Sequence, residues 1–258
     1  MCGLCGFSGK AEKRIIKEMT ELLIHRGPDD EGYFSSDKIN FGFRRLSIID
    51  IESGNQPIHN ENKKIWVVFN GEIYNHLELR KNLQKKGHYF YTDHSDTEVI
   101  VHLYEEYGKN FPNYLNGMFA IALWDENKEI LFLIRDRIGV KPLFYSEING
   151  RIIFASEIKS ILKFPEVKKN INLEAIYHYF SFKNIPAPLT AFENIYSLMP
   201  GEILEYSNSK INKEKYWKID FSNEIDDDEK SIIETISKLL EDAVKLRMQC
   251  DVPFGAYL

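Results

Sequence analysis

The sequence predicts an α+β fold in which helices accompany antiparallel strands. Two pairs of apolar runs, residues 118–124 with 130–134 and residues 143–145 with 152–155, each enclose a short polar turn. Such pairs are typical of β-hairpins, and Asn149-Gly150 is a strong turn signal. Apolar residues also recur at helical spacing in several segments, which indicates helices with one buried face. Hairpins and amphipathic helices in one chain favour a mixed fold class.

The first half of the chain is predicted to alternate strands with helices. The expected strands are short and rich in Ile, Val and Phe, at residues 2–8, 39–50 and 65–70. The expected helices have apolar positions three and four residues apart, at residues 11–24, 76–87 and 96–107. Asn75 is expected to cap the second of these helices, and a glycine ends or follows each of the three.

The second half adds elements whose composition changes toward the end of the chain. Beyond the hairpins we expect a helix at residues 173–182, strands at 202–206 and 216–219, and a long helix at 232–246. The acidic stretch at residues 224–229 is typical of a helix start, because acidic side chains oppose the positive end of a helix. Asp251 begins a further expected strand, at which the chain looks truncated. The composition therefore indicates a change of character after residue 220.

The overall composition is that of an ordinary globular chain and argues against several partners. The formal net charge of −6 argues against nucleic acid or an anionic membrane. No apolar run approaches the roughly 18 residues of a membrane-spanning helix, and no signal peptide is visible. Three cysteines are an odd number, unlike a disulfide framework, so a reducing cytoplasmic location is expected.

The first candidate for chemistry is Cys2, which follows Met1 directly. Removal of Met1 would leave Cys2 with a thiol and a free α-amine, and an amine with a pKa near 8 can accept the thiol proton. From position alone, an incidental or disordered chain end is equally compatible. Cys2 and Cys5 also form a Cys-x-x-Cys pair, which raises a zinc or redox alternative. A second pair is missing because Cys250 stands alone, so Cys5 is expected to be a packed core residue.

Asn70 and Gly71 lie at the end of the strand predicted for residues 65–70. A carboxamide and a flexible backbone N–H at a strand end are suited to hold a developing oxyanion. Asn-Gly is also a common turn dipeptide, and without Cys2 the turn would be the preferred interpretation.

Two charged residues are candidates for binding an amino acid. Arg45 precedes the apolar run that continues to Ile49, where an unpaired cation is costly. It would either capture a carboxylate with two hydrogen bonds or form a structural salt bridge. Asp96 would either bind a substrate ammonium or cap the following helix. Together, the two charges suit a zwitterion.

Two other patterns are predicted to be structural. The charged segment from Arg135 to Pro142 is expected to be a buried ion-pair turn. The seven histidines show no metal-ligand spacing on a single helix face, so no metal site is predicted.

Several motifs in a fixed order resemble the class II, N-terminal-nucleophile glutamine amidotransferases. They are Met1-Cys2-Gly3, His25-Arg26-Gly27-Pro28-Asp29, Arg45-Leu46-Ser47-Ile48-Ile49-Asp50, Asn70-Gly71-Glu72-Ile73-Tyr74-Asn75 and Ser95-Asp96-Thr97-Glu98. Three further motifs are similar to those of glutamine-hydrolysing asparagine synthetases, at residues 117–120, 135–145 and 154–159. The resemblance runs over nearly the whole chain.

This resemblance implies a four-layer αββα sandwich of two antiparallel sheets, of the Ntn-hydrolase type, with a truncated start of an α/β ATP-pyrophosphatase domain. Residues 1–212 would form the glutaminase domain. Residues 213–258 would supply a linker, a helix and the first strand of the synthetase domain, in which Leu258 would line the ATP site. Cys5 departs from the apolar residue of many relatives, which supports its packing role.

The resemblance also implies a role for each site residue. Cys2 would attack the side-chain amide of glutamine, while the Asn70 side chain and the Gly71 N–H hold the oxyanion. The substrate pocket would comprise Arg45, Leu46, Ser47, Ile48, Ile49, Asn70, Gly71, Glu72 and Asp96. In this pocket Arg45 would bind the α-carboxylate, and Asp96 with Glu72 would bind the α-ammonium. Met1 would have to be removed first.

The implied partners divide between the two parts of the chain. The glutaminase step needs no cofactor and no metal, whereas the synthetase domain would use ATP, Mg²⁺ and aspartate. Two alternatives remain: an amidotransferase with another acceptor, such as a sugar carboxylate, and a non-catalytic interaction module. The intact Cys2, Arg45, Asn70 and Asp96 argue against the second. A face exposed after residue 220 would favour association into a homodimer.

Overall fold

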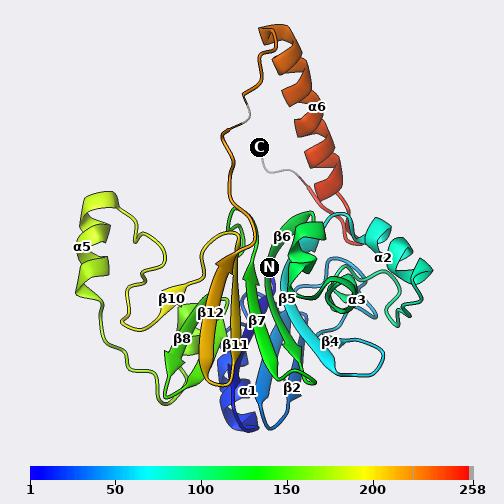
Figure 1. Ribbon diagram of the computed structural model, residues 1–258. Coiled ribbons are helices and arrows are strands. Elements are labelled where there is room, and N and C mark those ends of the chain that lie inside the picture. The colour runs from blue at the N-terminus through cyan, green and yellow to red at the C-terminus, as the bar shows by residue number, and fades with distance from the viewer. Residues whose placement is uncertain (223, 256–258) are drawn as a thin grey trace.

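The structure, a computed structural model, describes residues 1–222 and 224–255. Its strands form two antiparallel six-stranded sheets that lie face to face (Figure 1). The first sheet has the order β10-β8-β9-β1-β3-β2, formed by β1 (Gly3–Ser8), β2 (Asp30–Ser35), β3 (Ile39–Arg45), β8 (Phe144–Ile148), β9 (Arg151–Ala155) and β10 (Tyr196–Ser197). The second has the order β12-β11-β7-β6-β5-β4, formed by β4 (Ile58–His59), β5 (Ile65–Ile73), β6 (Gly117–Asp125), β7 (Ile130–Arg135), β11 (Glu202–Ser207) and β12 (Lys210–Lys215).

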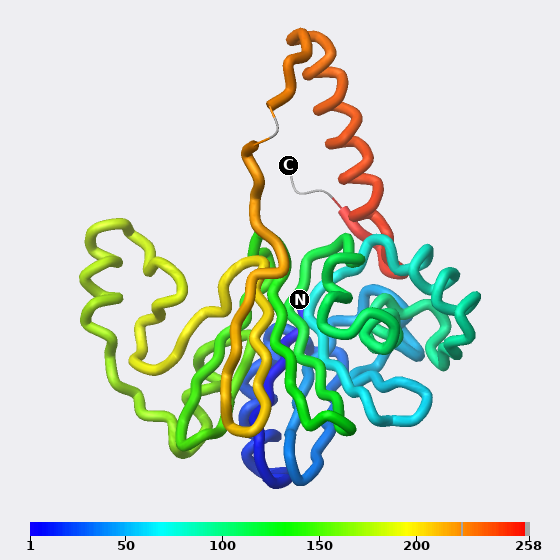
Figure 2. Tube along the Cα trace, viewed as in Figure 1, coloured from blue at the N-terminus to red at the C-terminus, as the bar shows by residue number. Residues whose placement is uncertain are grey.

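Helices cover the outer face of each sheet. The first sheet carries α1 (Lys13–Glu21) and α4 (Ile158–Ile161). The second carries α2 (His76–Lys85), α3 (Glu98–Tyr107) and the 3-10 helix η1 (Gly108–Tyr114). These layers confirm the αββα sandwich that the motifs implied. Two further helices, α5 (Leu173–Phe182) and α6 (Glu229–Arg247), stand away from the sandwich (Figure 2).

The sandwich has three apolar cores, and β1 contributes to two of them. All its residues are buried, and successive side chains of a strand point to opposite faces. Leu4 packs into the core between the sheets, whereas Cys5 and Phe7 pack into the core under α1 and α4. A third core lies between the second sheet and α2 with α3. β1 is therefore packed on both faces, and Cys2 directly precedes its first residue, Gly3.

The register of β1 decides what lies beside Cys2. β1 pairs with β3 so that Gly3 lies opposite Arg44, and with β9 on its other side. Cys2 is therefore next to the end of β3, where the chain leaves the sheet at Leu46. The C-terminal part of β5 lies against β1 from the second sheet. The candidate site forms where these three strand ends meet.

Most of the predicted elements are present, with instructive differences. Both predicted hairpins are confirmed, as β6 with β7 and β8 with β9, and the helix at residues 173–182 has the predicted bounds. The strand predicted for residues 216–219 is wrong. The strand here is β12, which pairs with β11 across Asn208-Ser209, and both turn residues have positive φ. This edge strand reads Lys-Ile-Asn-Lys-Glu-Lys and is largely exposed, so it lacks an apolar pattern.

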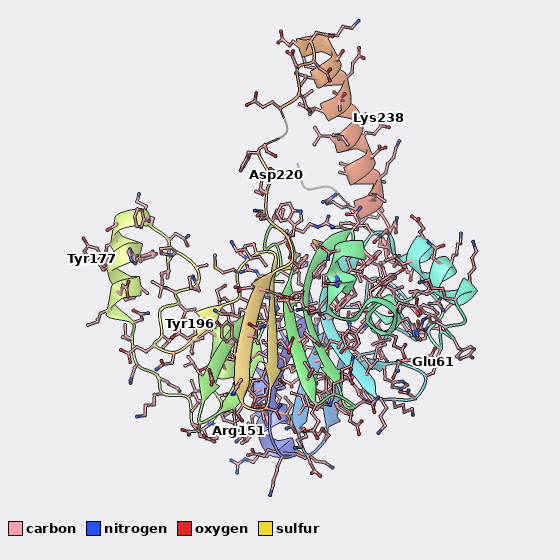
Figure 3. All side chains as sticks on the ribbon, in the orientation of Figure 1. Glu61, Arg151, Tyr177, Tyr196, Asp220 and Lys238 are labelled. Atoms are coloured by element: carbon pink, nitrogen blue, oxygen red, sulfur yellow. The ribbon has the colours of Figure 1, made fainter. Side chains whose placement is uncertain are left out.

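The C-terminal part differs from the sandwich. No residue of α6 is buried, and Tyr177 on α5 and Lys238 on α6 lie far from the sheets (Figure 3). The strand predicted from Asp251 is absent over residues 251–255, and Leu258 lies outside the described residues. The boundary predicted after residue 212 stays a prediction, although β12 continues to Lys215. Among the described helices, none combines the length and apolar character needed to cross a membrane.

Candidate active site

Cys2 is held from two sides at the start of β1. Its Sγ accepts a hydrogen bond from Leu46 N at 3.4 Å and faces Leu46 O at 3.6 Å, where the thiol can donate. Arg26 Nε donates to Cys2 O at 2.9 Å. Burial raises the pKa of the Cys2 thiol, and the bond from Leu46 N partly offsets this rise. This end of the chain is therefore ordered, which removes the alternative of a disordered terminus.

The predicted pocket residues are largely brought together. One pocket beside Cys2 is lined by eight of the predicted residues, namely Cys2, Arg45, Leu46, Ile48, Ile49, Gly71, Glu72 and Asp96. It is also lined by residues that the sequence did not single out, namely Gly54, Gln56, Phe69, Ser95 and Thr97. Ser47 and Asn70, which were also predicted, do not line the pocket. The Ser47 N–H donates to Asp29 Oδ2 at 2.8 Å. A nucleophile, a cation and two carboxylates thus share one small space.

Asn70 and Gly71 lie inside β5 and not in a turn, because β5 continues to Ile73. The turn alternative is therefore wrong. Asn70 is 1% exposed, and its side-chain Nδ2 has no hydrogen-bond partner among the described residues. A buried donor without a partner is costly unless a ligand can use it. A Cβ on Gly71 would lie 2.1 Å from Met118 O, so only glycine fits this close approach to β6.

Arg45 is buried beside the loop that follows β3. Its guanidinium donates to the carbonyl oxygens of Ile49 at 3.1 Å and Ile51 at 3.0 Å, and also to Asp50 O and Asn55 Oδ1. Among the described residues it forms no ion pair, so the structural salt bridge is wrong. Carbonyl dipoles orient the guanidinium without neutralising it. Its positive charge therefore remains available to a carboxylate in the pocket.

Asp96 and Glu72 form a pair of carboxyl groups with no ion-pair partner among the described residues, although Arg45 and Lys141 lie near enough to act on their charges. Asp96 does not cap α3, because its Oδ2 accepts the N–H of Ile73 in β5 at 3.0 Å. Burial raises the pKa of Asp96 to about 6. Burial and the nearby charge of Asp96 raise the pKa of Glu72 to about 8. A positive ligand group would favour the charged form of both.

Sequence comparisons identify the family to which this arrangement belongs. A family model for the glutamine amidotransferase domain matches residues 1–217. The chain belongs to this family. Over its full length it is 39% identical to the glutamine-hydrolyzing asparagine synthetase 1 of Bacillus subtilis, and 38% identical to a putative glutamine-hydrolyzing asparagine synthetase 2 of Methanocaldococcus jannaschii. The chain spans 42% and 54% of the lengths of these relatives, which is about half.

Solved structures share the amidotransferase sandwich at much lower identity. One is described as the allosteric regulatory enzyme of purine biosynthesis, with a TM-score of 0.64 and 19% identity. Another is glutamine phosphoribosylpyrophosphate amidotransferase from B. subtilis, with a TM-score of 0.63 and 20% identity. Each match covers 84% of this chain and 49% of the other. At this identity the likeness concerns the fold alone, and it agrees with the two antiparallel sheets.

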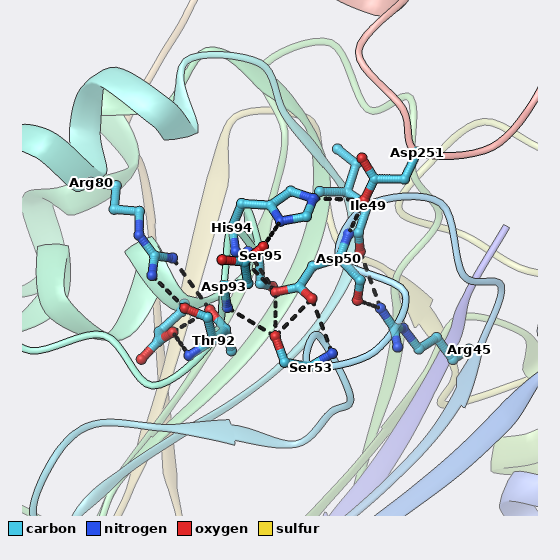
Figure 4. A network of polar contacts seen from close by, with 11 residues as sticks. Arg45, Ile49, Asp50, Ser53, Arg80, Thr92, Asp93, His94, Ser95 and Asp251 are labelled. Carbon is cyan, nitrogen blue, oxygen red and sulfur yellow. Dashed lines mark hydrogen bonds and ion pairs between the residues drawn. The ribbon is translucent and has the colours of Figure 1, made fainter.

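The amidotransferase pocket rests on a polar network that the sequence did not reveal (Figure 4). Asp50 is 2% exposed, and its carboxylate accepts the N–H groups of Ser53 at 3.0 Å, His94 at 3.1 Å and Ser95 at 3.0 Å. Asp251 Oδ2 accepts the Asp50 N–H at 2.7 Å and lies 2.6 Å from His94 Nε2. This network joins the loop after β3 to the segment that carries Asp96. A signal was present, since Asp50 and Ser53 have the spacing of a local turn.

Two structural predictions are also settled in the amidotransferase domain. Cys5 is fully buried, and its Sγ contacts Thr20 Oγ1 at 3.3 Å on the face of β1 opposite Cys2. The Cys-x-x-Cys alternative is therefore wrong.

The segment after β7 is not an ion-pair turn. The Asp136 carboxylate accepts backbone N–H groups instead, and Arg135 donates to carbonyl oxygens.

Proposed function

We propose that this domain hydrolyses glutamine to glutamate and ammonia through the thiol of Cys2. The observation that carries the proposal is the pocket that Cys2 shares with Arg45, which forms no ion pair among the described residues, and with the carboxyl groups of buried Asp96 and half-buried Glu72. Glutamine is a zwitterion with a side-chain amide, so it presents an anion, a cation and an electrophilic carbonyl. Family membership over residues 1–217 supports the same assignment.

The substrate's charged groups pair with the pocket in one orientation. The α-carboxylate binds near Arg45, and the α-ammonium binds between Asp96 and Glu72. The ammonium favours the ionised carboxylates, which overcomes the burial that raises their pKa values. The side chain of glutamine then extends toward Cys2. Leu46, Ile48 and Ile49 line the same pocket.

The chemistry requires Cys2 to be the first residue. While Met1 is present, the Cys2 nitrogen is an amide and cannot act as a base. After its removal, the α-amine accepts the thiol proton and the thiolate attacks the amide carbon of glutamine. The Asn70 Nδ2 and the Gly71 N–H stabilise the oxyanion, at roughly 3 kcal/mol for each donor. The nitrogen leaves as ammonia after receiving the proton, and water then cleaves the thioester to give glutamate.

The asparagine synthetases that the chain resembles are about twice its length, and they suggest where the ammonia goes. We infer that a synthetase part, with ATP and Mg²⁺, transfers the ammonia to aspartate, in the cytoplasm. These 258 residues contain no phosphate-binding glycine loop, so no step of that reaction is assigned to them. A sugar carboxylate as acceptor is the alternative. Ammonia transfer by the longer protein, measured with each acceptor, separates the two.

The decisive test is a glutaminase assay on protein shown by mass spectrometry to lack Met1. Cys2→Ala should release ammonia only at the background rate, because the nucleophile is gone. Cys250→Ala is the matched control, since Cys250 is also a half-buried free thiol, and should keep the wild-type rate. Equal ammonia release by wild type and Cys2→Ala would remove Cys2 from the reaction.

A further inference from the structure

Four side chains from three separate segments converge on the outer side of the second sheet, outside the Cys2 pocket. Glu61 comes from the turn between β4 and β5, and His88 from the connection between α2 and α3. His102 and Glu105 lie one turn apart on α3. Ligand atoms of all four lie within 4.8 Å of one another. Glu61 marks this place at the edge of the molecule, far from α5 and α6 (Figure 3).

Both imidazole rings present Nδ1 to the same two carboxylates. His88 Nδ1 lies 3.7 Å from Glu61 Oε1 and 3.5 Å from Glu105 Oε2. His102 Nδ1 lies 3.6 Å from Glu61 Oε2 and 3.1 Å from Glu105 Oε2. A tetrahedral zinc ion with bonds of about 2.0–2.2 Å separates its ligands by roughly 3.3–3.6 Å. Of the four separations, 3.5 and 3.6 Å fall in this range while 3.1 and 3.7 Å lie just outside it, and ligand atoms up to 4.8 Å apart must move closer to bind one ion.

The other nitrogen of each histidine faces an outer carboxylate. His88 Nε2 lies 3.1 Å from Glu106 Oε1, and His102 Nε2 lies 3.6 Å from Glu98 Oε1. Histidines that bind metals usually donate their second N–H to a carboxylate or carbonyl, which fixes the tautomer and leaves the other nitrogen free to bind. The His88 ring has this arrangement through Glu106, whereas His102 Nε2 lies near Glu98 but forms no hydrogen bond among the described residues.

The two glutamates of the cluster also accept hydrogen bonds from groups outside it. Glu105 Oε1 accepts a hydrogen bond from Asn60 Nδ2 at 2.8 Å, and Asn60 itself is 1% exposed. Glu61 Oε1 accepts the N–H of Tyr89 at 2.9 Å. Three of the four candidate ligands, Glu61, His88 and Glu105, thus have hydrogen-bond partners outside the cluster that orient them.

Charge and burial also favour a divalent cation. Four carboxylates surround the two rings, and His102 is fully buried while the side chain of His88 is 13% exposed. With neutral imidazoles the cluster is strongly negative. Protonation of both rings would compensate part of that charge, but it would place two like charges with ring centroids 4.9 Å apart. One divalent ion supplies the same charge at the point that all four ligand atoms face.

We propose that Glu61, His88, His102 and Glu105 bind one zinc ion. Two imidazole nitrogens and two carboxylate oxygens form a closed four-ligand set, which is the pattern of structural zinc and not of catalytic zinc. The ion ties the β4–β5 turn and the α2–α3 connection to α3. That connection carries Asp96, so the site fixes the base of the pocket wall without taking part in the chemistry.

The experiment measures zinc directly on the full chain, independently of glutaminase activity. The protein is stripped with a chelator, titrated with zinc chloride, and analysed for metal content after dialysis. We expect about one zinc ion per chain. Glu61→Gln and His88→Asn, which change one glutamate and one histidine outside the buried core, should abolish stoichiometric binding. His178→Asn, a histidine on α5 outside the cluster, is the matched control and should bind zinc like the wild type.

Two further measurements, the zinc affinity of an outer-partner variant and the change in Tm on adding zinc, give effects of intermediate size. Glu106→Gln removes only an outer partner and should weaken zinc binding by roughly 10–100-fold. At a zinc concentration about 100 times the dissociation constant, the wild-type Tm should rise by on the order of 5–10 °C, and that of His88→Asn should not move. Absence of saturable zinc binding by the wild type would overturn the proposal. The four side chains would then be a cluster of histidine–carboxylate ion pairs. Equal binding by His88→Asn, Glu61→Gln and the wild type would overturn it as well.

Discussion

Two buried aspartates, Asp96 beside Cys2 and Asp136 after β7, serve opposite purposes. Asp136 is 1% exposed, and its carboxylate accepts backbone N–H groups from Phe119 at 3.2 Å, Val140 at 2.9 Å and Lys141 at 2.9 Å. Asp96 is 6% exposed and accepts one backbone N–H, at 3.0 Å from Ile73. The first carboxylate is fully used by its own fold, whereas the second has acceptor capacity left.

This difference separates a structural charge from a binding charge. Hydrogen bonds from backbone N–H groups replace the water that a carboxylate loses on burial. Where such bonds are few, burial raises the pKa, as it does for Asp96 to about 6 and for Glu72 to about 8. The Cys2 pocket therefore favours a ligand that brings a positive group to these carboxyl groups. Arg45 shows the complementary case, because only carbonyl and amide oxygens contact its guanidinium.

The largest expected effect is on glutamine use. In Met1-free protein, Asp96→Asn should lower kcat/KM for glutamine by roughly 30–5,000-fold, because loss of one partner of a buried charge pair costs about 2–5 kcal/mol. Most of the loss should appear in KM, since the variant still has Cys2 and its oxyanion donors. Steady-state kinetics over a wide range of glutamine concentration measures both constants.

Asp93→Asn provides the matched control for this change. Asp93 lies in the same segment, but its side chain is 85% exposed and lines no part of the Cys2 pocket. It should keep the wild-type kcat/KM. A value for Asp96→Asn within threefold of the wild type would mean that Asp96 does not bind the substrate ammonium.

The second expected effect is on stability, and it concerns the other aspartate. Asp136→Asn should lower the free energy of unfolding by about 2–3 kcal/mol, because bonds to a charged acceptor are worth more than neutral ones and the new amide N–H₂ faces other donors. Urea denaturation measures the loss. KM for glutamine should stay near the wild-type value. A stable variant with a raised KM would place Asp136 with the binding charges and remove the contrast with Asp96.

The sequence predicted the parts of the fold that carry an apolar pattern. Both hairpins follow from paired apolar runs, and helix α5 has the bounds predicted for it. Its cap, Asn172, was not predicted. β12 was missed because an exposed edge strand needs no apolar face, and its charged residues protect the edge from pairing. The layered sandwich came from the family resemblance, since periodicity does not specify how sheets stack.

The site could be predicted only where its residues form contiguous motifs. Cys2, Asn70 with Gly71, and Asp96 each stand in a recognisable stretch. The structure brings Cys2, Gly71 and Asp96 to one pocket, and Asn70 is buried directly before Gly71 in β5. The histidine–glutamate cluster was not visible in the sequence because its members come from residues 61, 88 and 102–105, so no local spacing brings them together. Such a cluster becomes visible only after the fold has joined its segments.

The smallest expected effect concerns pH and stability. The usual pKa of an aspartate is 3.8, whereas burial holds the pKa of folded Asp96 at about 6. Between these values the folded chain keeps a proton that the unfolded chain has released. The contribution of Asp96 to stability is therefore fully present below about pH 4 and is lost as the pH rises through about 6.

Asparagine does not titrate, so Asp96→Asn should be spared this loss. The free energy of unfolding of the variant, relative to the wild type, should rise by on the order of 1–3 kcal/mol from pH 4 to pH 7. Urea denaturation of both proteins at several pH values measures this difference, with Asp93→Asn expected to parallel the wild type. If the Asp96→Asn curve also ran parallel to the wild type, Asp96 would ionise at its ordinary pKa. Burial would then not disfavour the charged form of Asp96. In that respect Asp96 would resemble Asp136, and the contrast drawn from their contacts would fail.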